Sequence, residues 1–428
     1  MTRLVAAVVR RGGWAVVDQA VVSIGGFSRN IIIAHYVSQE VFGAYGVLIL
    51  PAFLLLASFH AALIVYPVQV RTAAIEPDQR RGFTSASLCL TILLGIPLCL
   101  VMAAASAWAA KRANISISMT ALCGGVALMA FLVQELFRRT LAARLRFGAA
   151  IPGDAVAYLL PLAGLPLLAH AGKLDGDMSL PWALTAIAAC SLLGGLIQAV
   201  QVQLGRFNLH DLIHSTREFW RIGKWMLAAN LTTLITDLPY NYLLGLRHSL
   251  TSGAYFRVIS DFTRVANPIL FSVTGLIVPT VAQVHVAQGF NAARRVGLRY
   301  AAVGALILGC YFLIPMTVPG LLLGLIYPPD YAGAAPGVRL FAVTGLIMFS
   351  AMLLLAVLNG LGHPRAQFIA QVSNVAASLL VGLPATYFFG LPGVLWGGLF
   401  AMVTFAATAV WQFRRISHAH MAAEADKP

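Results

Sequence analysis

Long apolar segments dominate the pattern of hydrophobic and polar positions along the chain. Each runs for about twenty residues with few charges, which is the length that an α-helix needs to cross the hydrocarbon core of a membrane. We therefore predict an all-α polytopic membrane protein with about twelve transmembrane helices in two six-helix bundles. The predicted spans are residues 13–37, 43–66, 85–108, 117–137, 151–171, 181–204, 225–246, 253–282, 298–318, 338–358, 367–388 and 392–413.

The predicted eighth span has charged side chains where a membrane helix usually has none. Four of its positions, at i, i+4, i+7 and i+11, share one helix face. They are Arg257, Asp261, Arg264 and Pro268. A charge at the bilayer centre costs about 3 kcal/mol even on lenient scales, so such side chains usually face a water-filled cavity or a partner. We interpret this face as part of the lining of a hydrophilic cavity.

A second polar face occupies the predicted seventh span. Its members, again at helical spacing, are Asn230, Thr233, Asp237 and Asn241. Because neighbouring spans run in opposite directions, Asp237 and Arg264 are expected at similar depth, where they can pair. Two interpretations remain open: a closed set of ion pairs that fixes the helix packing, or groups that line an aqueous cavity.

The first span is the second most polar of the predicted helices. Asp18, Gly25 and Arg29 share one face, and Asn30 follows directly. With its neighbour Gly26, Gly25 would let another helix approach closely. Asp18 is either solvated near the cytoplasmic end or part of an ion-coupling site. Arg29 lies about 22 Å along the helix, where it either lines the cavity or extends to the outer surface.

A short internal sequence repeat suggests that the chain has two halves. The tripeptide Gly-Ala-Tyr recurs at 43–45 and 253–255, each time after a polar helix and a short turn. This recurrence suggests a parallel repeat of six spans, with the binding site between the halves. The predicted domains are an N-terminal bundle (1–204), a cytoplasmic amphipathic linker (205–224) and a C-terminal bundle with a short cytoplasmic tail (225–428).

Prolines interrupt many of the spans, where each removes a backbone hydrogen bond and can bend the helix. They are Pro51, Pro97, Pro161, Pro166, Pro239, Pro268, Pro315 and Pro384. Pro239 and Pro268 flank the two polar faces and are our hinge candidates. The fourth span ends in QELFRRTLAARLRFG, which we expect to lie on the inner leaflet as a basic amphipathic segment.

Composition agrees with a membrane protein. Of 428 residues, 59% are hydrophobic and 10% are charged, whereas soluble proteins have about 25% charged residues. The net charge of +14 would suggest nucleic acid in a soluble protein, but no basic and aromatic platform exists outside the spans. Most lysines and arginines fall in segments on the side of the N-terminus, so the positive-inside rule predicts that both termini are cytoplasmic.

Metal, disulfide and catalytic motifs are not evident. The five cysteines have no paired spacing, Asp175 and Asp177 make a poor cation site, and we expect His60 to be a packing residue. His210 and His214 are spaced as zinc ligands would be but have no third ligand nearby. We therefore predict neither a cofactor nor a metal, and no catalytic residue.

Three stretches together resemble a known family. DQAVVSIGGFSRNIIIAHYVSQEVFGAYGVL, with its polar helix, short turn and F-G-x-Y entry, is similar to the opening of the polysaccharide exporters, the Wzx-like O-antigen and lipid-linked oligosaccharide flippases. GLIYPPDYAGAAPGVRLFAV and NGLGHPRAQFIAQVSN resemble later loops of that family. These exporters are a branch of the multidrug/oligosaccharidyl-lipid/polysaccharide (MOP) superfamily.

The resemblance implies a two-lobed, MATE-like transporter of the bacterial cytoplasmic (inner) membrane. It would flip polyprenyl-diphosphate-linked oligosaccharide to the outer leaflet by alternating access, for O-antigen, lipopolysaccharide or exopolysaccharide biosynthesis. Its expected partners are this substrate, membrane lipids, and a polysaccharide polymerase or other assembly proteins.

The charged residues of the polar faces suggest how such a substrate would be bound. Guanidinium groups bind phosphate oxygens bidentately and stay charged, and Arg29, Arg257 and Arg264 outnumber Asp237 and Asp261 by one. The predicted substrate-binding residues are Arg29, Asn30, Asn241, Arg257 and Arg264. The carboxylates that could couple transport to H⁺ or Na⁺ are Asp18, Asp237 and Asp261.

Two alternatives remain. A drug or cation antiporter of the same superfamily would favour an acidic cavity with aromatic side chains. A polysaccharide polymerase or ligase would need a large outer loop or domain for chemistry, whereas the longest predicted outer connection is only residues 319–337. We therefore favour a transporter over an enzyme.

Overall fold

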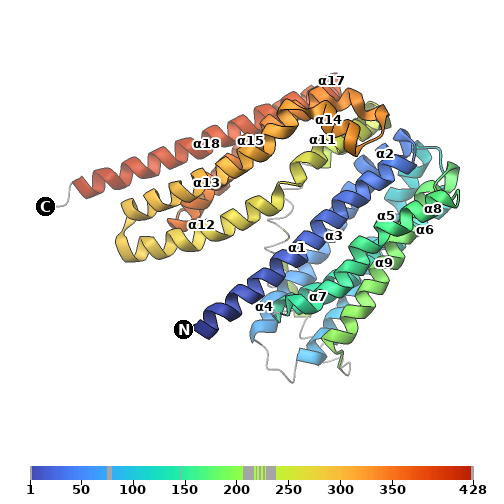
Figure 1. The fold of residues 1–428 in the computed structure, drawn as a ribbon, viewed down its shortest axis with the longest axis horizontal. Helices are drawn as coiled ribbons and strands as arrows, with labels where there is room; N and C mark the ends of the chain where they lie inside the picture. Colours follow the sequence, from blue (N-terminus) through green and yellow to red (C-terminus); the bar gives the residue numbers. More distant parts are fainter. Residues whose placement is uncertain are drawn as a thin grey trace. The chain divides into compact units, whose positions relative to one another are not determined.

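The computed structural model describes most of the chain, and Figure 1 shows its helices. The described residues are 2–74, 80–144, 146–205, 216–217, 219–220, 223–224, 227 and 238–425. Within these ranges the regular structure is entirely helical, as predicted, with no strand. The residues group by their spatial contacts into two compact units, Met1–Gly245 (unit 1) and Leu246–Pro428 (unit 2).

The elements are α-helices joined by short turns and interrupted by single π-helical or 3₁₀ turns. Unit 1 contains α1 (Thr2–Tyr36), α2 (Gln39–Ala44), η1 (Tyr45–Ile49), α3 (Leu50–His60), η2 (Ala61–Val65), α4 (Tyr66–Ala74), α5 (Arg80–Arg112), α6 (Ile117–Ala143), α7 (Phe147–Asp154), η3 (Ala155–Leu159), α8 (Leu160–His170), η4 (Gly176–Met178) and α9 (Ser179–Val202). Unit 2 contains α11 (Leu250–Arg264), α12 (Asn267–Gln288), α13 (Phe290–Thr317), α14 (Pro319–Ile326), η5 (Pro329–Ala334), α15 (Ala335–Gly360), α16 (Pro364–Ala377), η6 (Ser378–Gly382), α17 (Leu383–Phe389) and α18 (Leu391–Ala425).

Nine helical segments of the described residues are long and apolar enough to cross a membrane. The chain is therefore a multi-pass membrane protein, and the nine segments coincide with nine of the predicted spans. The first predicted span lies within α1, the seventh falls largely outside the described residues, and the eighth is divided between α11 and α12. The total of twelve spans, their orientation and the bundle boundaries at 204 and 225 stay predictions.

Each π-helical turn of the described helices ends two residues before a proline. Proline has no N–H to donate to the carbonyl four residues earlier, and its ring crowds that carbonyl, so the local turn widens. The pairs are η1 with Pro51, η2 with Pro67, η3 with Pro161 and η6 with Pro384. Pro97, Pro166 and Pro315 instead lie inside α-helices.

The predicted eighth span is broken next to one of the hinge candidates. α11 ends at Arg264, two residues form a turn, and Pro268 stands in the first turn of α12. Proline disfavours helical geometry in the residue before it, but suits the start of a helix. The polar face of this span is consequently continuous only from Arg257 to Arg264, and the prediction that it extends to Pro268 is wrong.

Small residues bring the helices of unit 1 close together. A Cβ atom on Gly25 would lie 2.6 Å from the carbonyl oxygen of Tyr158, which confirms the predicted close approach, whereas Gly26 has open space beside it. A Cβ atom on Gly194 of α9 would lie 2.4 Å from the carbonyl oxygen of Gly153 of α7. α6 packs along both α5 and α9, as α15 packs along α13 and α18 in unit 2 (Figure 1).

Candidate functional site

A buried arginine on α6 organises the polar centre of unit 1. Arg138 donates from Nη2 to Asp18 Oδ2 at 3.0 Å, from Nη1 to Glu135 Oε2 at 3.1 Å and from Nε to Asp154 Oδ2 at 3.3 Å. Its side chain is 5% exposed and that of Asp154 is fully buried. Three helices, α1, α6 and α7, therefore meet at one guanidinium.

Two glutamines complete this unit 1 network. Gln134 Nε2 donates to Asp154 Oδ1 at 2.8 Å, and Gln198 Nε2 donates to the same oxygen at 3.0 Å. Gln198 also donates to the Ala150 carbonyl, and both glutamines are fully buried. The close approach of α7 and α9 at their glycines is what brings Gln198 to the carboxylate of Asp154.

The charges of the network do not cancel. Asp18, Glu135 and Asp154 supply three negative charges, whereas Arg138 and Arg139 supply two positive ones, the latter through a 2.6 Å contact with Glu135. With every carboxylate ionised, the group has an excess of one negative charge. A buried excess charge is costly unless a proton or a cation neutralises it.

Three buried oxygen atoms of the network have no hydrogen-bond donor among the residues that the structure describes. They are Asp18 Oδ1, Gln134 Oε1 and Gln198 Oε1. Buried polar atoms are normally paired, and carboxylate or amide oxygens are the ligands of hard cations and waters. Together with the excess negative charge, these oxygens suit a proton, a monovalent cation or an ordered water.

The sequence interpretation of this region was wrong in one respect and incomplete in another. The segment QELFRRTLAARLRFG was expected to lie on the inner leaflet, but Gln134, Glu135 and Arg138 are buried because they share the face of α6 that meets α1 and α7. The available signal was Asp154 and Gln198, two polar residues inside otherwise apolar spans. Asp18, in contrast, was predicted correctly as a polar position of the first span and is not solvated, being 6% exposed.

A small cavity lies farther along α1. It encloses about 140 Å³ and is lined by Arg29 together with aromatic and apolar side chains. Two π-helical turns supply part of the lining, Tyr45 from η1 and Tyr158 from η3. The Nε atom of Arg29 is buried and has no hydrogen-bond partner in the described part of the chain. Next to it, Asn30 is buried and accepts a 3.4 Å hydrogen bond from the Tyr45 hydroxyl.

In unit 2, the predicted arginine and carboxylate of α11 pair with each other. Arg257 Nη2 lies 2.9 Å from Asp261 Oδ1, and their side chains are 4% and 2% exposed. Tyr327, which follows α14, donates a 3.3 Å hydrogen bond to Asp261 Oδ2. Sequence analysis missed Tyr327, because it lies in a segment that we predicted only as an outer connection. The Arg257–Asp261 pair is what the packing interpretation predicts for this part of the charged face, and the rest of that prediction stays open.

The remaining predicted site residues lie elsewhere in the described chain or outside it. Arg264 is exposed at the end of α11, and Asn241 and Pro239 are partly buried within the helical residues 238–247. Asp237 lies outside the described residues, as do Asn230 and Thr233 of the same predicted face. Arg29 belongs to unit 1 and Arg257, Asp261 and Arg264 belong to unit 2.

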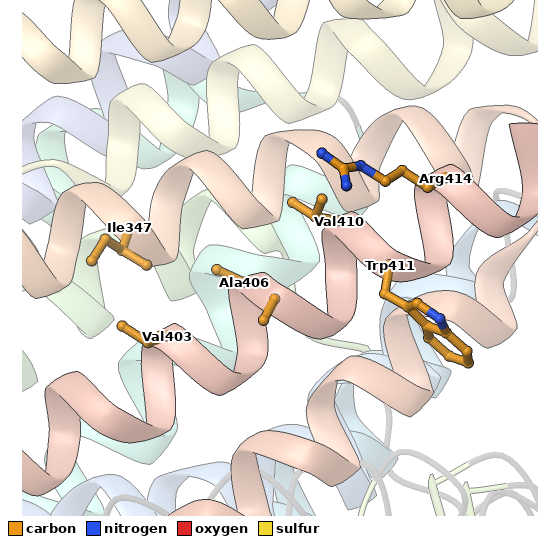
Figure 2. A pocket seen from close by; sticks show the side chains of 7 residues that line it. Ile347, Val403, Ala406, Val410, Trp411 and Arg414 are labelled. Atoms are coloured by element: carbon orange, nitrogen blue, oxygen red, sulfur yellow. The ribbon is translucent and has the colours of Figure 1, made fainter.

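A second concave surface lies on unit 2, along α18 next to Ile347 of α15 (Figure 2). This groove has a volume of about 510 Å³, and its lining is apolar except for Arg414 and Trp411 at one end. Binding sites usually combine apolar walls with several convergent polar groups. The Arg29 cavity and the adjacent unit 1 network meet that description better.

The histidines, cysteines and loop aspartates considered in the sequence lie outside these sites. His60 is buried and its Nε2 lies 3.1 Å from Thr91 Oγ1, as expected of a packing residue. Among the described residues no cluster of three or more metal-ligating side chains occurs, and the cysteines are free. Asp175 and Asp177 are exposed, and His210 and His214 lie outside the described residues.

Comparisons with solved structures identify the fold. An inward-facing multidrug resistance MATE family transporter of the MOP superfamily matches with a TM-score of 0.75 and 15% identity, over 94% of this chain and 95% of that chain. The lipid II flippase MurJ, in an inward closed conformation, matches with a TM-score of 0.69 and 11% identity, over 93% of this chain and 87% of that chain. The chain has the fold of the MOP superfamily transporters.

A third structure is a MOP superfamily transporter from Pyrococcus furiosus, described as having a binding pocket of reverse polarity. It matches with a TM-score of 0.64 and 15% identity, over 96% of this chain and 95% of that chain. No protein-family model and no curated protein matches the sequence. The MOP fold agrees with the predicted two-lobed, MATE-like architecture, while the polysaccharide-exporter branch stays a prediction.

Proposed function

We propose that this MOP-fold protein is a flippase that moves polyprenyl-diphosphate-linked oligosaccharide from the cytoplasmic to the outer leaflet of a bacterial inner membrane by alternating access. The observation that supports this proposal most directly is Arg29, a cation of the predicted first span that lines a cavity and whose buried Nε has no partner among the described residues. A guanidinium in this state can bind phosphate oxygens bidentately.

The other predicted substrate contacts extend the same chemistry. Asn30, buried beside Arg29, and Asn241 would bind sugar hydroxyls, while Arg264, exposed at the end of α11, would add a second cation. Arg257 would take part only by exchanging Asp261 for a phosphate. The fold shared with a lipid II flippase supports a lipid-linked substrate, and a polysaccharide polymerase or another assembly protein would use the flipped product.

The unit 1 network supports ion coupling in this proposal. Its single excess negative charge can be neutralised by H⁺ or Na⁺. Asp18 Oδ1, which has no hydrogen-bond donor among the described residues, is the atom that such an ion would bind. Asp237 and Asp261 are the other proposed coupling carboxylates. We expect Asp18→Asn to remove the dependence of transport on a proton or sodium gradient in proteoliposomes. An unchanged dependence would exclude Asp18 as the coupling group.

The decisive experiment is complementation of a flippase-deficient bacterium at matched membrane abundance. We expect Arg29→Ala to abolish polymer export while the lipid-linked precursor accumulates on the cytoplasmic side, and Arg29→Lys to restore only part of it, because an ammonium lacks the bidentate geometry. Arg415→Ala is the matched control, since this exposed arginine stacks on Trp411 at 5.5 Å, outside the site. Normal export by Arg29→Ala would contradict the proposed phosphate contact.

One observation favours a second candidate, a drug or cation antiporter. The unit 1 network has an excess of one negative charge. The chain also shares its fold with a multidrug resistance transporter. Such a function predicts that expression in a drug-sensitive strain raises resistance to cationic drugs and that Asp154→Asn abolishes this resistance. A flippase predicts no change in drug resistance.

A further inference from the structure

Arginines from two different elements converge on the last turn of α9. Arg144 and Arg146 belong to the turn that links α6 to α7. Arg144 Nη1 donates to the Val202 carbonyl at 2.7 Å and Nη2 to Thr84 Oγ1 at 3.0 Å, and Arg146 Nη1 donates to the Gln201 carbonyl at 3.2 Å. These contacts satisfy carbonyls that a helix C-terminus leaves without partners.

A third arginine approaches from the first turn of α5. Arg81 Nη2 donates to the side chain of Gln203, the residue that caps α9 with a positive φ of 59°. The chain that follows is fixed to α5 as well, because Gly205 N donates to the Arg81 carbonyl at 3.3 Å and to Ser85 Oγ at 3.0 Å. We call Arg81, Arg144 and Arg146 the arginine cluster. The backbone segments around these three side chains are tied together by the hydrogen bonds just described.

The arginine cluster has more positive charge than its contacts require. None of its members forms an ion pair with a carboxylate in the described part of the chain. A helix C-terminus offers only about half a negative charge. Burial lowers the pKa of Arg144, and the nearby Arg80, Arg146 and Arg81 lower it further. Like charges from several arginines therefore meet at this point.

The hydrogen-bonding capacity of the cluster is also only partly used. Each guanidinium has five N–H donors, whereas Arg81 and Arg146 donate one hydrogen bond each to the protein and Arg144 donates two. The Nε atom of Arg144 is buried and unpartnered. An anion with several oxygens would both occupy these donors and relieve the repulsion.

We propose that the arginine cluster is a binding site for the phosphate or diphosphate group of a membrane-anchored lipid, separate from the Arg29 cavity. The cluster stands at the ends of the spans formed by α5, α6 and α9, where lipid headgroups are expected, and on the side that the basic residues predict to be cytoplasmic. A charge bias that only set the topology would need basic residues in these loops, but not their convergence on one point. The proposal does not depend on transport.

The first test measures binding of inorganic pyrophosphate to the full-length protein in neutral detergent by calorimetry. We expect the double variant Arg81→Gln/Arg146→Gln to weaken binding at least about tenfold, since it removes two charge-assisted contacts. Both side chains are exposed, so the variant should keep its fold, which its melting temperature checks. The control Arg414→Gln/Arg415→Gln removes the same charge from the end of α18 and should change affinity less than about twofold.

Two results would overturn the proposal: no measurable pyrophosphate binding by the wild type, or equal weakening in both double variants. The source of the phosphate is then distinguished in nanodiscs of phosphatidylcholine with or without phosphatidylglycerol. Loss of pyrophosphate binding only when phosphatidylglycerol is present identifies an anionic phospholipid headgroup as the occupant. Retained binding in both membranes identifies a diphosphate lipid. Because no step measures flipping, failure here and failure of the proposed flippase activity are separate outcomes.

Discussion

Both units bury arginine against carboxylates, but they differ in whether the charges balance. In unit 2, one arginine, Arg257, meets one carboxylate, Asp261, and Tyr327 donates to the remaining oxygen. In unit 1, Arg138 contacts three carboxylates at once, and Asp18 Oδ1 is left without a donor. The unit 2 pair is balanced in charge, although Arg257 Nε is buried without a partner among the described residues, whereas the unit 1 network needs a further positive charge.

This difference separates two uses of buried charge. A balanced, hydrogen-bonded pair can be exchanged for apolar side chains with little loss of stability, so its presence alone says little about function. An unbalanced group favours whichever ligand restores neutrality, and that ligand can be exchanged during a transport cycle. The comparison therefore favours unit 1 as the place where a coupling ion would act, although the sequence drew attention first to α11 of unit 2.

The largest expected effect comes from removing the shared cation of unit 1. Arg138→Met leaves Asp18, Glu135 and Asp154 buried together, and breaking a buried pair in this way costs about 3–5 kcal/mol. We expect little folded protein in the membrane and a lowered melting temperature in detergent. Arg139→Met is the control, because its side chain is 40% exposed and contacts only Glu135. A melting temperature for Arg138→Met equal to that of the wild type would contradict the organising role of Arg138.

A smaller effect is expected from the unit 2 pair, and it depends on which partners are replaced. Arg257→Met alone leaves the carboxylate of Asp261 buried and should cost about 3 kcal/mol. The double variant Arg257→Met/Asp261→Leu removes both charges and should return the stability to within about 1 kcal/mol of the wild type. Thermal denaturation of the single and double variants measures both values.

The matching pair of variants in unit 1 sharpens the comparison. Arg138→Met/Asp154→Leu also removes one arginine and one carboxylate, but Asp18 and Glu135 remain buried without Arg138. We therefore expect only partial recovery relative to Arg138→Met. If this double variant recovered as fully as the one in unit 2, the two clusters would not differ in the way that their charges suggest.

The sequence predicted the helical class, most spans and many polar positions, because apolar length and helical spacing act locally along the chain. Asp18, Arg257 and Asp261, which it predicted as polar positions within spans, are all buried. It did not predict which groups meet, since the contact between Asp18 and Arg138 joins residues 120 positions apart. Arg138 was misjudged because a basic residue near the end of a span looks the same in sequence whether it faces lipid headgroups or a buried carboxylate.

A modest effect is expected from the hydrogen bond that completes the unit 2 cluster. Tyr327→Phe removes the hydroxyl that donates to Asp261 and should lower stability by about 1 kcal/mol, because the pair with Arg257 remains. Tyr387→Phe is a suitable control, since this ring is 46% exposed and keeps its contact with Arg247. A difference much larger than this between the two variants, measured by thermal denaturation, would mean that Tyr327 does more than complete the cluster.

The smallest expected effect is a pH dependence of stability that arises at His363 in unit 2. His363 lies between α15 and α16, with its ring 5.5 Å from that of His420, which stacks on Phe290 at 4.0 Å. Burial, together with His420 and His285, lowers the pKa of His363 from its ordinary value of 6.5. The unfolded chain then binds a proton at higher pH than the folded chain, so stability falls as the pH drops through 6.5 and is constant well above it.

The pH dependence can be assigned by comparing two histidine variants. We expect the melting temperature of the wild type to decrease between pH 7 and pH 5.5, and His363→Gln to make this decrease shallower by removing the titrating ring. His418→Gln, on an exposed position near the end of α18, should leave the slope unchanged. An equal slope in the wild type and His363→Gln would place the proton elsewhere.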